Sequence, residues 1–162
     1  MIALGFDPGT ARLGYGIIES EPEPRAMDYG VIVTSPSAPM AQRLLEIHAA
    51  VGELIARYRP DAIAVELLFF ARNVTTAMTV GQARGVVLLA AAQHGVPLAE
   101  YSPSEVKQAV VGYGKADKQQ IQEMVRIMLD LASVPAPDDA ADALAVAICH
   151  AQIAPFRARV GM

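Results

Sequence analysis

The sequence predicts a single α/β domain built on a mixed five-stranded sheet flanked by helices. The first observation is a series of three short apolar segments within the first 34 residues, separated by turn residues, which is typical of an antiparallel meander. The second is that two further strand-like segments alternate with helical patterns along the rest of the chain. With 162 residues, 53% of them hydrophobic, the chain is large enough for one compact core. We expect one domain over residues 1–155 and a short tail over residues 156–162.

The meander is expected to consist of strands at residues 2–6, 13–19 and 28–34. Pro8 and Gly9 supply the first turn, and a Glu-Pro-Glu-Pro segment at residues 21–24 supplies the second. Connections this short join neighbouring antiparallel strands.

Helical periodicity starts after Pro39. One side of this first helix carries the apolar residues Leu44, Leu45, Ile47, Val51, Leu54 and Ile55. A break at residues 59–61 precedes a fourth strand at residues 62–66. A long helix is expected over residues 73–94, followed by a fifth strand that ends at Tyr101. Ser102 and Ser104 are candidate caps of the next helix, and further helices are expected over residues 116–131 and after residue 137.

Composition excludes some classes of protein. The single cysteine, Cys149, excludes an internal disulfide and favours a reducing compartment. The chain starts without a basic leader, and its longest apolar run, residues 85–92, is too short to cross a bilayer. We therefore expect a cytoplasmic protein without a membrane partner. The net charge of −4 and pI near 5.3 count mildly against nucleic acid, but residues 67–99 contain no acid and include Arg72 and Arg84.

Four carboxylates interrupt the apolar pattern. Asp7 and Glu66 each end a strand-like segment, whereas Asp139 and Asp142 open the last apolar stretch and share one helix face. Acids in such positions are seldom buried unless they are paired or bound to metal, and hard oxygen ligands suit Mg²⁺ or Mn²⁺. Two such ions on one carboxylate cluster are the usual machinery for cutting a phosphodiester. The residues thus favour a metal-dependent nuclease.

Each carboxylate also has a plainer interpretation. Asp-Pro-Gly is good turn chemistry anywhere, and the same motif opens the actin-like ATPase fold. Glu66 fits a solvated strand end. The aspartates after Pro137 fit a helix N-terminus, where we expect Asp138 to act as the cap. Asp142, flanked by alanines, is harder to explain by capping alone.

Other residues give weaker signals. Lys107, Lys115 and Lys118 flank a glycine-bracketed turn and would be ordinary surface lysines on charge alone. The apolar segment at residues 67–70 continues into a predicted loop, where a core role is the simpler expectation for two or three of its four side chains. The three histidines are scattered without ligand spacing, and we interpret them as structural.

The pieces match one family in order along nearly the whole chain. The matching segments are Gly5-Phe6-Asp7-Pro8-Gly9-Thr10, Gly14-Tyr15-Gly16, Ala64-Val65-Glu66, Gly81-Gln82-Ala83-Arg84-Gly85, Val106-Lys107-Gln108, Val111-Gly112, Lys118 and Asp139-Ala140-Ala141-Asp142-Ala143-Leu144-Ala145. In these segments the chain closely resembles the RuvC family of bacterial Holliday junction resolvases, which belongs to the RNase H-like superfamily. Within this pattern the Asp-Ala-Ala-Asp register selects Asp139 over Asp138, and the pI is lower than is common in the family.

The resemblance implies a function and its residues. Asp7, Glu66, Asp139 and Asp142, hereafter the carboxylate tetrad, would bind two Mg²⁺ ions, with Mn²⁺ as a substitute, and paired symmetric nicks with 5′-phosphates would resolve four-way junctions in recombination and repair. Lys107 and Lys118 would contact DNA near the scissile phosphate, and Phe69 would insert at the junction. Arg72, Arg84 and Lys115 are further candidate DNA contacts. The family implies a homodimer that cooperates with the RuvA–RuvB branch-migration complex.

Three other functions remain open at this stage. A related RNase H-like nuclease could act on other structured nucleic acid. An actin-like ATPase would share the Asp7 motif but requires a second phosphate-binding half, which 162 residues do not hold. A junction-binding module without activity is disfavoured because all four acids are present.

Overall fold

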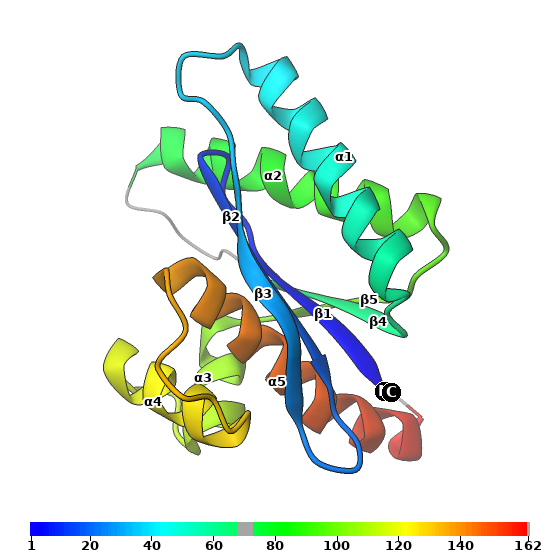
Figure 1. The fold of residues 1–162 in the computed structure, drawn as a ribbon, viewed down its shortest axis with the longest axis vertical. Helices are drawn as coiled ribbons and strands as arrows, with labels where there is room; N and C mark the ends of the chain where they lie inside the picture. The colour runs from blue at the N-terminus through cyan, green and yellow to red at the C-terminus, as the bar shows by residue number, and fades with distance from the viewer. Residues whose placement is uncertain (68–72, 162) are drawn as a thin grey trace.

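The computed structural model describes residues 1–67 and 73–161, drawn as the coloured ribbon of Figure 1. Phe69 and Arg72, both predicted to contact DNA, lie outside these residues, as does Phe70. The predictions for them therefore remain predictions.

A five-stranded mixed sheet forms the centre of the protein, in the order β3-β2-β1-β4-β5. Strands β1 (Ile2–Asp7), β2 (Arg12–Glu19) and β3 (Arg25–Val33) form the expected antiparallel meander. Strands β4 (Ala62–Glu66) and β5 (Leu98–Tyr101) are added in parallel to β1. The predicted mixed sheet is confirmed, and β1 lies at its centre, with an antiparallel neighbour on one side and a parallel one on the other.

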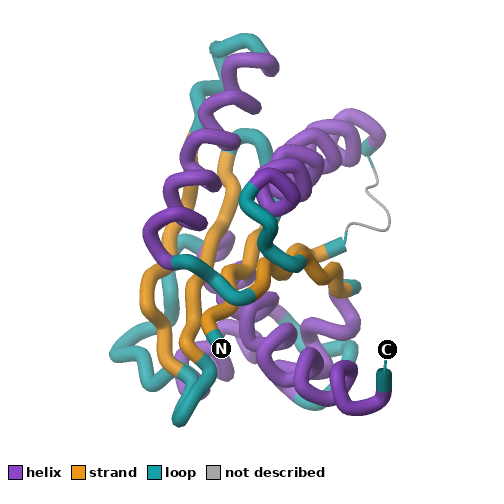
Figure 2. Tube along the Cα trace, turned by 90° about the vertical axis from the view of Figure 1, so that its right-hand side faces the viewer, coloured by secondary structure: helices purple, strands orange, loops and turns teal. Residues whose placement is uncertain are grey.

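In the part of the chain that the structure describes, five helices cover the two faces of the sheet. Helices α1 (Met40–Tyr58) and α2 (Val74–Gln93) pack together on one face. Helices α3 (Pro103–Val111), α4 (Lys118–Met128) and α5 (Asp138–Val160) cover the other, with α5 lying against the sheet and in contact with α3 and α4. Figures 1 and 2 show the sheet between these two helical layers.

Side-chain alternation along β1 divides the core in two. Leu4 and Phe6 point into the cluster formed with α1 and α2. Ala3 belongs to the cluster on the α5 face, and the two-residue period places Gly5 and Asp7 on that same face. The carboxylate of Asp7 is therefore directed toward α5 by the same alternation that buries Phe6 on the other side.

Capping fixes where two of the site's helices begin. The Ser102 hydroxyl accepts a hydrogen bond from the Glu105 amide, and the Glu105 carboxylate accepts one from the Ser102 amide. Asp117 and Gln120 form the same reciprocal pair at the start of α4. Ser102 rather than Ser104 is thus the cap of α3, and α4 begins two residues later than the sequence predicted.

One expectation about α5 was wrong. Pro137 is the N-cap of α5, and the Asp138 side chain instead accepts a hydrogen bond from Gln122 and pairs with Lys118. Helix α5 continues beyond Pro155 to Val160, so the first residues of the predicted C-terminal tail are helical. An interior proline removes one helical hydrogen bond and crowds the preceding turn, but this last part of α5 is held by Arg157, which packs over the Tyr101 ring.

Helix α2 is long and apolar enough to cross a membrane by length and composition alone. Its buried residues, Ala83, Val87, Ala90 and Ala91, pack into the core shared with α1. The helix therefore serves as a core element, and its other side, which carries exposed Val74, Met78 and Leu89, requires a separate explanation.

Candidate metal and DNA site

Asp7 and Glu66 lie next to each other at one edge of the sheet. The parallel pairing of β1 with β4 matches Phe6 with Val65, and the next residue of each strand is the acid. Parallel strands present their carboxyl ends at the same edge, and both acids lie on the face covered by α5. The two strand-end carboxylates predicted from the sequence are therefore brought together.

Glycines in β1 and β2 allow α5 to approach this edge. Gly5 pairs with Gly16, and Asp7 pairs with Gly14. The three glycines therefore leave a neighbouring area of the α5 face of β1 and β2 without side chains. A Cβ built on Gly14 would lie 2.5 Å from the carbonyl carbon of Asp139, and one on Gly16 would lie 2.8 Å from the Leu144 side chain. Carbon atoms normally approach to about 3.5–4.0 Å. The first turn of α5 thus lies directly on the strand backbones.

This approach brings the aspartates of α5 beside Asp7. Asp139 Oδ2 lies 3.2 Å from Arg12 Nε, and Asp142 Oδ2 lies 3.6 Å from Lys118 Nζ. Lys118 also pairs with Asp138 at 3.2 Å. The side chains of Asp139 and Asp142 are each 31% exposed and Asp138 is 64% exposed, which favours the first two as the inward-facing pair.

Burial and like charge raise the pKa of Asp7, Glu66 and Asp142. Burial first, and then the charge of Asp142 and the other acids of the tetrad, raise the pKa of Asp7 to about 8. Burial and Asp142 raise the pKa of Glu66 to about 7, against the opposing effect of Lys107 and Lys118. Burial also raises the pKa of Asp142, with Lys118 opposing it. Such raised pKa values mean that the ionised forms disfavour one another in this site, so a cation bound nearby would stabilise the carboxylates.

The donor set suits a hard divalent cation, because all four members are carboxylates. Within residues 1–67 and 73–161, no three acidic, histidine or cysteine side chains already lie at mutual metal-ligand spacing. Asp139 and Asp142 are turned toward Arg12 and Lys118 instead. The residues therefore fit a metal in their chemistry and location, and in this structure protein cations supply part of the positive charge.

A cleft of about 380 Å³ opens beside Glu66 and Asp142. Lys107 of α3 and Lys118 of α4 line it together with the two acids, and its remaining lining includes Val106, Ala116, Ile121 and Ala145. Burial opposes the charge on Lys118, but the neighbouring Asp142 and Asp138 outweigh burial and raise its pKa. Both lysines predicted to lie near the scissile phosphate thus line the same cleft as two members of the tetrad, Glu66 and Asp142.

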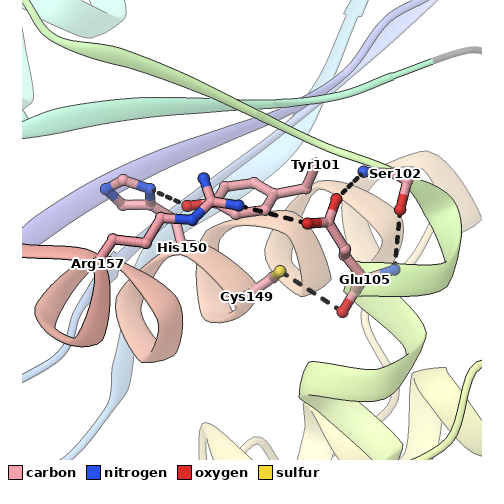
Figure 3. Close-up of polar contacts among 6 residues, drawn as sticks. All are labelled: Tyr101, Ser102, Glu105, Cys149, His150 and Arg157. Atoms are coloured by element: carbon pink, nitrogen blue, oxygen red, sulfur yellow. Dashed lines mark hydrogen bonds and ion pairs between the residues drawn. The ribbon is translucent and has the colours of Figure 1, made fainter. Parts of the chain in front are cut away.

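A polar network behind the cleft holds α3 (Figure 3). The Glu105 carboxylate that caps α3 also lies 3.4 Å from Arg157 Nη2 of α5. The Tyr101 hydroxyl and His150 Nδ1 share a buried hydrogen bond of 2.8 Å, and the Cys149 thiol donates to the Glu105 carbonyl at 3.7 Å. These contacts join β5, α3 and α5, and so fix the helix that presents Lys107. The predicted structural roles of His150 and Cys149 agree with this arrangement.

The other candidate DNA contacts lie in different surroundings. Lys115 is exposed in the connection between α3 and α4. Arg84 of α2 pairs with Glu100 of β5, so its charge is already partly balanced within the protein. Arg12 was not singled out from the sequence. Its position two residues before Gly14, the strand partner of Asp7, was the available signal.

Comparisons with known proteins agree with this geometry. The family described as crossover junction endodeoxyribonuclease RuvC matches residues 3–150. The crossover junction endodeoxyribonuclease RuvC of Chloroflexus aurantiacus is 57% identical over 163 residues, covering 100% of this chain and 99% of the relative.

Solved structures give the same fold. Thermus thermophilus RuvC in complex with Holliday junction substrate has a TM-score of 0.90 and 43% identity, covering 99% of this chain and 96% of that chain. The yeast mitochondrial Holliday junction resolvase Ydc2 has a TM-score of 0.64 at 13% identity, covering 97% and 83%, which is a likeness of fold alone. The chain has the RNase H-like fold predicted from its sequence.

Proposed function

Because the chain belongs to the crossover junction endodeoxyribonuclease RuvC family, we propose that its carboxylate tetrad binds two Mg²⁺ ions and cuts four-way DNA junctions by paired symmetric nicks. The enzyme is an endodeoxyribonuclease that resolves Holliday junctions in DNA recombination and repair, and its family is dependent on divalent metal.

The observation that carries the metal assignment is the convergence of partly buried carboxylates from β1, β4 and α5. Burial and mutual repulsion raise the pKa of Asp7 to about 8, so divalent cations would replace repulsion with attraction. Two ions bound to such a cluster supply activation of the attacking water and stabilisation of the leaving 3′-oxygen, and Mn²⁺ would substitute for Mg²⁺. The product would carry a 5′-phosphate.

Residues of the chain itself would orient the substrate. Lys107 and Lys118 lie in the cleft beside Glu66 and Asp142, where their ammonium groups would bind phosphate oxygens and hold the scissile phosphate against the tetrad. Phe69 would be a further DNA contact on the sequence resemblance, and Lys115 and Arg72 would be further contacts because of their positive charge. Arg84 is the weakest candidate because of its pairing with Glu100.

We propose that the functional enzyme is a homodimer formed through α2. Val74, Met78, Gly81, Gly85 and Leu89 recur at three- and four-residue spacing and so share one face of the helix. The three large side chains are exposed, and a Cβ on either glycine would meet no atom within 4 Å in the described part of the chain. Such a face admits close approach of a second helix, and a two-fold dimer would match the two symmetric scissile phosphates of a junction.

Cytoplasmic action and cooperation with the RuvA–RuvB branch-migration complex complete the proposal, both on the strength of family membership. Dimerisation is tested by sedimentation at micromolar protein concentration. A monomer that still made paired symmetric cuts would contradict it.

The tetrad is tested by substitution. Asp7→Asn, Glu66→Gln, Asp139→Asn and Asp142→Asn should abolish cleavage of a four-way junction while leaving junction binding largely intact, because they remove ligand charge and leave the lysines in place. Asp138→Asn is the matched control and should be milder, since Asp138 is more exposed and pairs with Lys118. An inactive Asp138→Asn enzyme together with an active Asp139→Asn enzyme would show that the register is wrong.

The substrate and metal are tested in the same assay. A four-way junction, a linear duplex and an RNA–DNA hybrid are compared, because preferential cutting of the hybrid would favour a related RNase H-like nuclease. Mg²⁺ or Mn²⁺ should support cutting. Ca²⁺ should support binding only, because its longer and looser coordination would misplace the reacting oxygens.

A further inference from the structure

Arg12 approaches the tetrad from the sheet, whereas Lys107 and Lys118 approach it from helices. It is the first residue of β2, and its Nε lies 3.2 Å from Asp139 Oδ2. Lys118 approaches from α4 and pairs with Asp138 and Asp142. The first turn of α5 is therefore bound by one cation from the sheet and another from a helix.

The ion pair between Arg12 and Asp139 is accessible to solvent and to competing ions. The Arg12 side chain is 51% exposed and Asp139 is 31% exposed, so the bond lies at the solvent edge of the site. An exposed pair of this kind is worth little by itself. A divalent cation bound to Asp139 would compete for the same oxygen with twice the charge, and it would also repel the guanidinium.

We propose that Arg12 is a phosphate-contacting residue that balances the charge of Asp139 before metal binds and turns to a DNA phosphate once metal has taken that carboxylate. The exchange rests on the metal-binding role proposed above for the tetrad. It requires no covalent step, only the transfer of an ion pair from a carboxylate to a phosphate.

The chemistry of Arg12 suits the second partner. A guanidinium presents paired N–H donors that match two phosphate oxygens and keeps its charge at any physiological pH. Its position on β2 places this donor on the sheet side of α5, whereas Lys107 and Lys118 lie on α3 and α4. A DNA strand bound by all three residues would be contacted from both the sheet and the helical layer.

If Arg12 exchanges partners in this way, the substitution Arg12→Gln should strengthen Mg²⁺ binding and weaken junction binding. In Arg12→Gln, Mg²⁺ affinity measured by calorimetry without DNA should rise by about three- to tenfold, because a competing positive charge is removed. Junction affinity in Ca²⁺ should fall, and the slope of its logarithm against log salt should decrease by about one phosphate contact. A residue with only a structural role would not strengthen metal binding.

Two variants control for charge and for the loss of a surface arginine. Arg12→Lys keeps the charge and should retain wild-type Mg²⁺ affinity. Arg25→Gln removes another exposed, carboxylate-paired arginine, from the first residue of β3, where it pairs with Glu19 at the other end of the β2–β3 ladder. Arg25→Gln should change both the Mg²⁺ affinity and the salt slope much less than Arg12→Gln does.

The outcomes separate the two proposals. If wild-type protein bound no Mg²⁺, or if Asp142→Asn bound it equally well, the metal-binding tetrad would be wrong and the exchange with it. If wild-type protein bound Mg²⁺ and Arg12→Gln left the affinity unchanged or weaker, the exchange alone would be overturned. Tighter Mg²⁺ binding with an unaltered salt slope would equally overturn the phosphate contact.

Discussion

Gly14→Ala should move Asp139 and Asp142 of α5 away from Asp7 and Glu66 at the strand ends, although it adds only one methyl group. Gly14 pairs with Asp7 in the β1–β2 ladder and lies under the first turn of α5. The added Cβ would lie 2.5 Å from the carbonyl carbon of Asp139 and 3.0 Å from its Cβ. These atoms belong to helix backbone and to its first side-chain carbon, so no rotamer change relieves the contact.

The size of the effect follows from that distance. Carbon atoms approach to about 3.5–4.0 Å, so the start of α5 has to move by about 1 Å. Overpacking of this kind typically costs about 1–3 kcal/mol, and a contact with backbone belongs at the upper end of that range. A 1 Å misplacement of reacting groups can cost about 100-fold in rate. Because Asp139 and Asp142 move together, we expect cleavage to fall by about that factor.

Urea unfolding and single-turnover cleavage of a four-way junction measure the two effects separately. Cleavage is compared at a temperature where the variant is fully folded, so that loss of stability does not mimic loss of rate. Gly52→Ala in α1 is the matched control, because its Cβ would meet the His94 ring at an ordinary 3.6 Å. It should stabilise the protein by up to about 1 kcal/mol, as alanine does in place of glycine within a helix, and leave cleavage unchanged.

The reasoning would be refuted by a Gly14→Ala protein with wild-type unfolding free energy and wild-type cleavage. Such a result would mean that α5 does not lie on the strand backbone at this point. Loss of stability with an unchanged rate would mean that the carboxylates tolerate the displacement.

Three other substitutions test the surroundings of the tetrad. Lys107→Ala should slow cleavage more than it weakens junction binding, because Lys107 lies beside Glu66 in the cleft; full activity would return it to the status of a surface lysine. Tyr101→Phe should lower the free energy of unfolding by about 1–3 kcal/mol in urea titrations, because buried His150 loses its partner, and an unchanged stability would mean that water replaces the hydroxyl. Phe69→Ala should slow junction cleavage about tenfold or more through lost stacking on a base, without a change in melting temperature; a sharply lower melting temperature with a normal rate would identify Phe69 as a core residue.

Local patterns predicted most of the fold. The alternation of apolar residues and the Pro-Gly turn located β1 and β2 within one residue at each end, because side-chain direction in a strand depends only on its two-residue period. The end of the last helix depends on contacts with other elements. The part of α5 beyond Pro155 is held by contacts of Arg157 with Glu105 and Tyr101, which are about fifty residues away in the sequence.

Long-range charge pairs were beyond the reach of sequence patterns. Arg84 was a reasonable DNA contact in a segment without acids, but the fold places Glu100 beside it. Arg12 follows a turn and was not among the predicted site residues, yet it pairs with Asp139 across 127 positions of the chain. Such pairs depend on which strand and helix ends meet, and that is a property of the assembled sheet.

Residue types and their spacing identified the chemically unusual residues, namely four acids at the ends of apolar segments, and the family that shares them. How those acids meet depends on the packing of distant segments. Parallel pairing of β1 with β4 puts Asp7 beside Glu66, and the glycines of β1 and β2 let α5 bring Asp139 and Asp142 onto the same edge. The physical reason is that residue types and their spacing are local, whereas charge crowding, burial and the counter-charges that relieve them exist only once distant segments are packed together.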